Sequence, residues 1–252
     1  MIESSIIIKN AIYLALSDTK ARYRKSVIGP LWLTLANLIG ILGLGLVWGS
    51  LMQENLSEFV PQLAVGLVCW NLISGVLLDA SNVFVRQSSM IRNIAIPCWF
   101  FSMRGFAKHI INLFHNLLIM LGIAIYYKLK ISSGIVFLPL GLLLLILNLY
   151  WIYHGIALFG ARFRDVELMM ASFVPFLFFV SPVLFRVEKI VGLGWFFALN
   201  PLTYMIDSVR MPYLGLSINL KVYAILTLTL IVGGGLTYCL NKSIGKKLVY
   251  WV

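Results

Sequence analysis

Long apolar stretches dominate the chain and alternate with short polar connections. A helix needs about 20 mostly apolar residues to cross the hydrocarbon core of a bilayer. In lipid, its backbone polar groups must also be paired within the segment itself. Six stretches are long enough, and we predict a membrane-spanning helix in each. They are residues 28–52, 59–85, 105–127, 134–159, 168–185 and 220–241.

Two further segments are apolar in part but do not fit a spanning helix. Residues 186–219 are interrupted by Asn200 and Pro201, so we expect a broken, re-entrant hairpin on the outer side. In residues 1–27, apolar side chains recur on one helical face, which predicts an amphipathic helix in the membrane interface. That face consists of Ile8, Ala11, Ile12, Ala15 and Leu16. The predicted fold is an all-α integral membrane protein with a single transmembrane domain, residues 1–252.

Composition and charge indicate how the chain is oriented. Hydrophobic residues make up 61% of it and charged residues 12%, whereas soluble domains carry about 25% charged residues. A net charge of +11 would suggest nucleic acid as the partner of a soluble protein, but here 14 of the 20 Lys and Arg residues lie at the termini and around the connections after the second and fourth predicted spans. Cytoplasmic loops carry such an excess. We therefore expect a multi-pass protein with both termini cytoplasmic, a cytoplasmic loop at residues 86–104, and no nucleic-acid partner.

Asp79 lies deep within the second predicted span. An unpaired carboxylate there would cost several kcal/mol, so it needs a partner or a wet cavity. Arg86 follows two helical turns later, and Lys108 and His109 at the start of the third span reach a similar depth. Two interpretations stay open: a polar point on a transport path or proton relay, or an interhelical ion pair that fixes packing.

Motifs that would give the chain its own chemistry are absent from the sequence. It contains no GxxxxGK[ST] phosphate loop, no HExxH and no pair of CxxC motifs, and its three histidines lack ligand spacing. We expect no catalytic residue, no metal site and no cofactor bound by this chain. The chain cannot hydrolyse ATP through a phosphate loop of this form.

Aromatic side chains gather in the external segment after the fifth predicted span. Together with the break in that segment they suggest an external gate or a substrate exit, although interfacial aromatic belts need the same residue types. The candidate gate residues are Trp195, Phe196, Asn200, Pro201 and Tyr204.

Four short segments carry a resemblance to a known family. They are Ala21–Trp32, Met90–Pro97, Ala161–Val166 and Asn200–Tyr204. With the basic N-terminal helix and the six predicted spans, they resemble the permease subunits of type-2 ABC exporters, and within these the polysaccharide-export branch. The resemblance covers essentially the whole chain, and the first and third segments are its more specific parts.

The resemblance implies an exporter of a lipid-linked glycan, such as an O-antigen, capsule or teichoic-acid polymer, in the inner membrane. It implies a homodimer that works with two cytoplasmic ATPases, which hold the ATP and Mg. The expected ATPase-coupling residues are Met90, Ile91, Arg92, Asn93 and Ile94. The expected substrate-access residues, whose positive charges suit a pyrophosphate-linked lipid, are Arg22, Tyr23, Arg24 and Lys25. Membrane topology alone is the competing explanation for these charges.

Other functions remain as alternatives. A type-2 ABC exporter of small hydrophobic molecules would share the short external loops. An integral-membrane transferase acting on polyprenyl-linked sugars would need acidic groups at the inner face, where Asp165 and Glu167 occur together; more simply, these acids neutralise Arg162 and Arg164. A passive channel would show solute flux without ATP.

Overall fold

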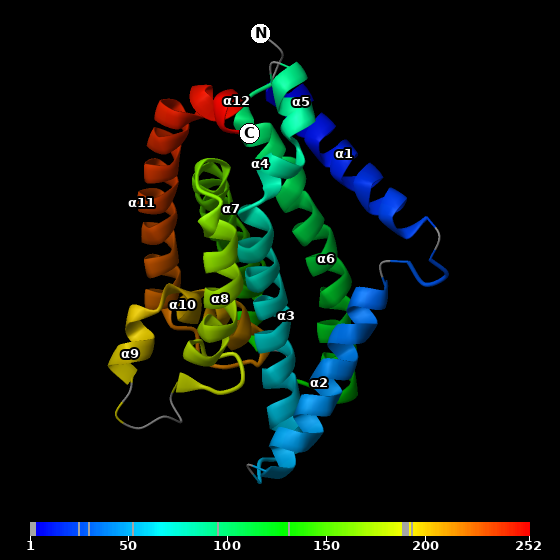
Figure 1. The fold of residues 1–252 in the computed structure, drawn as a ribbon. Coiled ribbons are helices and arrows are strands. Elements are labelled where there is room, and N and C mark those ends of the chain that lie inside the picture. Colours follow the sequence, from blue (N-terminus) through cyan, green and yellow to red (C-terminus); the bar gives the residue numbers. More distant parts are fainter. Residues whose placement is uncertain are drawn as a thin grey trace.

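The computed structural model describes residues 4–24, 26–29, 31–51, 53–94, 96–130, 132–187, 192 and 194–252. Every regular element in these ranges is a helix (Figure 1). The α-helices are α1 (Ser4–Tyr23), α2 (Leu31–Leu51), α3 (Leu56–Ala80), α4 (Val83–Arg86), α5 (Ser88–Asn93), α6 (Cys98–Tyr126), α7 (Phe137–Arg162), α8 (Asp165–Val180), α9 (Gly194–Leu199), α10 (Pro201–Tyr213), α11 (Leu220–Ile244) and α12 (Leu248–Trp251). Two 3-10 turns, η1 (Ser133–Val136) and η3 (Gly245–Lys247), precede α7 and α12.

Five helical segments in the described part of the chain are long and apolar enough to cross a membrane. They are α2, α3, α6, α7 with its preceding turn η1, and α11. This confirms an all-α integral membrane protein. The fifth predicted span, 168–185, corresponds to α8, which has 16 residues. At 1.5 Å per residue it is about 24 Å long, shorter than the hydrocarbon core, so a sixth crossing stays a prediction.

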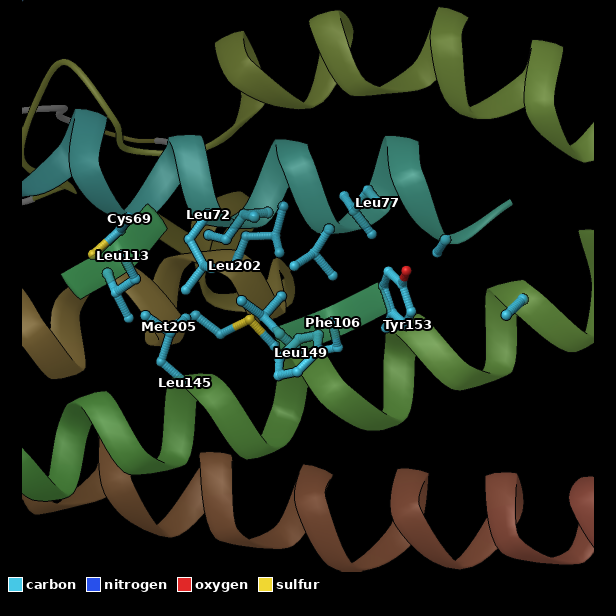
Figure 2. Close-up of a cluster of buried hydrophobic side chains, with 14 of the residues drawn as sticks. Cys69, Leu72, Leu77, Phe106, Leu113, Leu145, Leu149, Tyr153, Leu202 and Met205 are labelled. Carbon is cyan, nitrogen blue, oxygen red and sulfur yellow. The ribbon is translucent and has the colours of Figure 1, made fainter. Parts of the chain in front are cut away.

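Helix α3 forms the centre of the bundle. It is the most deeply buried of the spanning helices, at 67% of its apolar window against 17% for α2. Helices α2, α6, α7, α8 and α10 pack around it. Figure 2 shows the resulting core, where Leu72 and Leu77 of α3 face Leu149 of α7 and Met205 of α10. The core between α3, α7 and α10 is thus filled by apolar side chains.

The predicted external hairpin consists of two short helices separated at the expected break. Helix α9 ends at Leu199, and α10 begins at Pro201, where a missing N–H costs nothing. The carboxamide of Asn200 accepts a hydrogen bond from the backbone N–H of Leu202 at 2.9 Å, which caps α10. Helix α10 then packs against α3, α7 and α11. Arg210 is 2% exposed, and its guanidinium donates to the backbone carbonyls of Pro182, Val183 and Phe185.

Helix α1 is docked on the bundle. Its predicted apolar face divides into two parts, because Ala11 and Ala15 are fully buried whereas Ile8, Ile12 and Leu16 are exposed. The helix packs along α6, and Asp18 forms a bidentate ion pair with Arg104 of α6, with both N to O distances 2.9 Å. Protein contacts therefore hold α1, in addition to any contact with lipid.

The connection predicted at residues 86–104 is shorter in the structure. Helix α4 ends at Arg86, α5 follows, and α6 begins at Cys98 rather than at 105. The charge of Arg104 suggested a loop, but its ion pair with Asp18 lets the helix continue through it. The start of α1 and the C-terminal helix α12 lie at the same end of the bundle as α5, opposite the α2–α3 connection (Figure 1). This arrangement agrees with an even number of crossings.

Close contact between helices at Gly141 generates a stability prediction. A Cβ atom on Gly141 of α7 would overlap with the backbone carbonyl oxygen of Ser208 in α10, whereas a Cβ on Gly235 of α11 would meet nothing within 4 Å. Gly141→Ala should cost about 1–3 kcal/mol through overpacking, and Gly235→Ala should be neutral or slightly stabilising. The apparent melting temperature in detergent checks this. Equal melting of the two variants would contradict the packing described.

Candidate functional site

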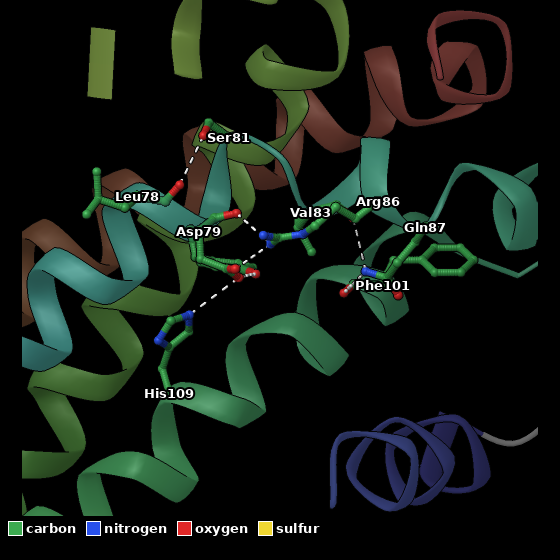
Figure 3. A network of polar contacts seen from close by, with 9 residues as sticks. Leu78, Asp79, Ser81, Val83, Arg86, Gln87, Phe101 and His109 are labelled. Carbon is green, nitrogen blue, oxygen red and sulfur yellow. Dashed lines mark hydrogen bonds and ion pairs between the residues drawn. The ribbon is translucent and has the colours of Figure 1, made fainter. Parts of the chain in front are cut away.

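A polar cluster centred on Asp79 joins four helices at the end of the bundle nearest α5. The carboxylate of Asp79, at the end of α3, pairs with the guanidinium of Arg86 from α4. It also accepts a hydrogen bond from the hydroxyl of Tyr153 in α7 at 2.6 Å. Nε2 of His109 in α6 lies 3.4 Å away. Figure 3 shows Arg86 and His109 approaching Asp79 from two sides.

The geometry of this cluster favours the packing interpretation of Asp79. Its side chain is 20% exposed, and that of Arg86 is 51% exposed, so the pair lies at an edge of the bundle rather than deep within it. Lys108, the other predicted intramembrane polar residue, lines a small pocket with Asp18, Thr19 and Tyr23 of α1. Asp79 therefore draws its partners from Arg86, His109 and Tyr153, and these contacts tie α3, α4, α6 and α7 together.

The predicted ATPase-coupling residues lie in and just after α5, and they differ in exposure. Ile91 is buried, and the sulfur of Met90 lies 3.6 Å from Nη1 of Arg104. Nε of Arg92 donates to the carbonyl of Val252 at 2.6 Å, which ties α5 to the C-terminal end of the chain. Arg92, Asn93 and Ile94 are exposed, and of these described residues Asn93 and Ile94 make no hydrogen bond with the C-terminal residue. A partner protein would thus meet Asn93 and Ile94 first, while Met90 and Ile91 hold α5 in place.

The predicted substrate-access residues follow the end of α1. Tyr23 lines the small pocket that contains Lys108, and Arg24 is exposed in the turn after the helix. Lys25 and the side chain of Arg22 lie outside the described residues. The structure thus brings one access residue, Tyr23, next to the predicted intramembrane Lys108.

The predicted external gate residues lie at the opposite end of the bundle from α5 (Figure 1). Trp195 and Phe196 are exposed and their rings are 6.0 Å apart. The hydroxyl of Tyr204 donates to the carbonyl of Ala198 at 2.7 Å, which fastens α10 to α9. The aromatic side chains of Trp195, Phe196 and Tyr204 thus lie on the two helices that flank the break at Asn200 and Pro201. Gate and interfacial belt remain alternative roles for these residues.

Asp165 and Glu167 lie in the first turn of α8. Negative charge is stabilising there because of the helix dipole, which favours the structural interpretation of these acids over the enzymatic one. Among the described residues, no group of three or more His, Cys, Asp or Glu side chains is placed to hold a metal ion.

The structure contains a polar pocket that was not predicted from the sequence. It lies between α2, α3 and α6, has a volume of about 140 Å³, and is lined largely by polar side chains. These are Asn37, Asn71, His109, Asn112 and Asn116, together with Leu72 and Leu113. The available signal was the spacing of polar residues in the third span, where Arg104, Lys108, Asn112 and Asn116 recur at every fourth position.

Another asparagine shows the contrasting case of a fully bonded carboxamide. Asn148 of α7 is completely buried. Its Nδ2 donates to the carbonyls of Leu144 and Leu226, and its Oδ1 accepts from Trp151 and Thr229. This side chain joins α7 to α11, a role common for asparagine in membrane helices.

The cluster around Asp79 leads to a second stability prediction. Asp79→Asn removes the charge that Arg86 faces and should lower stability by about 1–3 kcal/mol. Arg86→Gln should cost less, because Tyr153 and His109 still contact the carboxylate and half of Arg86 is already exposed. Melting curves of the two variants in detergent measure the difference. An unchanged melting temperature for Asp79→Asn would contradict a packing role.

Comparison with known proteins agrees with this architecture. The sequence profile of the ABC-2 type transporter family matches residues 11–214. The O-antigen export system permease protein RfbA of Myxococcus xanthus is 23% identical over 202 residues, covering 79% of this chain and 78% of that protein. A protein of the same name from Klebsiella pneumoniae is 21% identical over 238 residues, covering 92% and 89%. The family match extends from α1 to the end of α10, and the chain belongs to the ABC-2 type transporter family.

Proposed function

We propose that this chain is the membrane subunit of an ATP-driven exporter that moves a lipid-linked polysaccharide, of the O-antigen, capsule or teichoic-acid type, out across the cytoplasmic membrane. The observation that carries the proposal is coverage: relatives named as O-antigen export permeases align with up to 92% of the chain. The family match adds the transporter class. The aligned region therefore includes most of the helical bundle.

The ATP and Mg belong, in this proposal, to a separate cytoplasmic ATPase dimer. The chain has no phosphate-binding loop of its own. The energy of ATP hydrolysis must therefore be transmitted to it through a contact with the ATPase. Helix α5 offers that contact, because Asn93 and Ile94 are exposed at the end of the bundle where the start of α1 and α12 lie. That end is then the cytoplasmic one, which agrees with the excess of Lys and Arg there.

The exporter contains two copies of this chain. In each copy the core between α3, α7 and α10 is filled by apolar side chains (Figure 2), so the polymer passes along another face of the bundle. A second copy facing the first would close such a path against lipid. The exposed apolar side chains of α2, with 17% of its window buried, then face either that copy or the bilayer.

A lipid-linked pyrophosphate enters this path near the end of α1. Arginine binds phosphate oxygens through two parallel hydrogen bonds, and Arg24 is exposed beside Tyr23 at the start of the α1–α2 connection. Arg22 and Lys25 add positive charge nearby in the sequence.

An exporter of small hydrophobic molecules is the second candidate, and one observation favours it. An apolar groove of about 730 Å³ lies between α1, α6 and α7, lined by residues that include Ile12, Phe106 and Phe114. Its lining suits any lipid tail as well as a small apolar cargo. The two candidates are distinguished by the amount of surface glycan in a strain that lacks this chain: a glycan exporter predicts its loss, and an exporter of small molecules predicts a normal amount.

Deletion of the chain should abolish surface glycan and leave its lipid-linked precursor in the inner leaflet. Arg24→Glu should reproduce this loss while the protein still inserts and binds its ATPase. Lys247→Glu, the same charge change at an exposed site near the C-terminus, is the control and should export normally. Glycan gels and membrane fractionation measure both. Normal export by Arg24→Glu would refute the pyrophosphate role.

Purification of the tagged chain from its native membrane should yield an ATPase in equal amount. The double change Asn93→Ala and Ile94→Ala should reduce its recovery or its coupled ATPase activity at least severalfold, because both side chains are exposed. The control Ser89→Ala, also exposed on α5, should retain the partner. Full recovery and coupling in the double variant would contradict coupling through α5.

A further inference from the structure

The polar pocket between α2, α3 and α6 lies within the membrane-spanning part of the bundle. Asn112 is the midpoint of α6 (Cys98–Tyr126), and all three helices are among those long and apolar enough to cross a membrane. An amide side chain in hydrocarbon without a hydrogen-bond partner costs several kcal/mol. A concentration of four asparagines at this depth therefore needs an explanation.

Bonding between helices explains only half of the set. Nδ2 of Asn37 donates to Oδ1 of Asn116 at 2.8 Å, which ties α2 to α6. The carboxamides of Asn71 and Asn112 line the same pocket, and neither makes a hydrogen bond to another part of the described chain. Packing alone would leave these two amides unsatisfied, in contrast to the fully bonded Asn148. They are placed to bind something that is not part of this chain.

The pocket continues a polar strip along α6 that begins where α6 packs against α1. Arg104 pairs with Asp18 of α1, and four residues later Lys108 lines a small pocket with Tyr23. Asn112 lines both that small pocket and the larger one. At 1.5 Å per residue, Asn116 lies about 18 Å along α6 from Arg104. The strip thus connects the substrate-access residue Tyr23 with the polar pocket between α2, α3 and α6.

The chemistry of the strip changes along its length. Charged groups occur at the α1 end, whereas the inner pocket presents neutral carboxamides, each with two donor hydrogens and an acceptor oxygen. Hydroxyl groups are the natural counterpart, since they also donate and accept. A phosphate would be poorly matched there. The volume of about 140 Å³ would hold about four or five water molecules at roughly 30 Å³ each, so a group with several hydroxyls fits.

We infer that this pocket is a sugar-binding subsite, in which Asn71 and Asn112 bind hydroxyl groups of the glycan as it passes into the membrane. This inference rests on the proposed glycan-export function. His109 completes the wall, and its contact with Asp79 holds the ring in place (Figure 3). The subsite replaces part of the water that sugar hydroxyls lose on leaving the cytoplasm.

The test is the double change Asn71→Leu and Asn112→Leu in a strain lacking the native chain. Leucine has a similar size but no polar group, so surface glycan should fall on the order of tenfold, as expected from the loss of two neutral hydrogen bonds. The melting temperature should be unchanged or higher, because two unpartnered amides are removed. Asn148→Leu, the control for a bonded asparagine, should lower the melting temperature.

A direct readout uses a photo-crosslinking amino acid at position 112, with position 114 as the control. Phe114 lines the apolar groove between α1, α6 and α7, so a probe there should capture lipid tails but no sugar chain. A probe at 112 should give conjugates that form a glycan ladder. Absence of this ladder, as for a pocket filled by water only, overturns the subsite.

The outcomes also separate this inference from the proposed function. If deletion of the chain leaves surface glycan intact, the proposed function fails, and the subsite with it. If deletion abolishes the surface glycan and the variant with Asn71→Leu and Asn112→Leu restores normal export, the proposed function is supported and the subsite is refuted. A double variant that melts lower than the native chain would instead assign Asn71 and Asn112 to packing, and likewise refutes it.

Discussion

Every polar group that lies away from water needs a hydrogen-bond or ionic partner, and the rest of this structure depends on that constraint. A spanning helix pairs its own backbone, but each polar side chain within the membrane needs a separate solution. The chain uses three. Asp79 gathers Arg86, His109 and Tyr153 from three elements; Arg210 points its guanidinium at the backbone carbonyls before α9; and Asn148 bonds α7 to α11. Each solution also fixes one helix against another.

These contacts explain why α3 and α10 occupy the interior. Neither position follows from hydrophobicity, since α7 is more apolar than α3. Two contacts hold helix α10 in the interior. Arg210 donates hydrogen bonds to backbone carbonyls in the stretch after α8, and Ser208 packs closely against Gly141 of α7. Small residues permit such approach in membranes, where apolar side chains gain little by leaving lipid for protein. Polar bonds and tight backbone contacts therefore determine which helix is central.

Five of the six predicted spans, the break at Asn200 and Pro201, and the helical conformation of α1 could be predicted from the sequence because each is local: apolar length, a proline at a helix start, and a helical repeat. The helical extent of α6 could not, because Arg104 marks a loop until its partner Asp18 is known, and that partner lies 86 residues away. The length of α8 was likewise overestimated, since apolar residues continue past Val180, where the helix ends. Hydropathy reports solvent preference and does not report where a helix stops.

The candidate sites show the same division between local and long-range information. Asp79 was identifiable because a lone carboxylate in an apolar stretch is conspicuous. Which of Arg86, Lys108 and His109 contact it could not be predicted, because this depends on how each helix is rotated about its axis. The asparagines were not conspicuous, because a single amide in a span is a common packing device. Only their convergence from α2, α3 and α6 distinguishes Asn71 and Asn112 from Asn148.

Neutral amides suit a transporter of sugars in this position, since they bind hydroxyl groups without the fixed charge that hydrocarbon penalises. A moving polymer also requires weak contacts that can be exchanged from one sugar to the next, and neutral hydrogen bonds meet that requirement better than ion pairs.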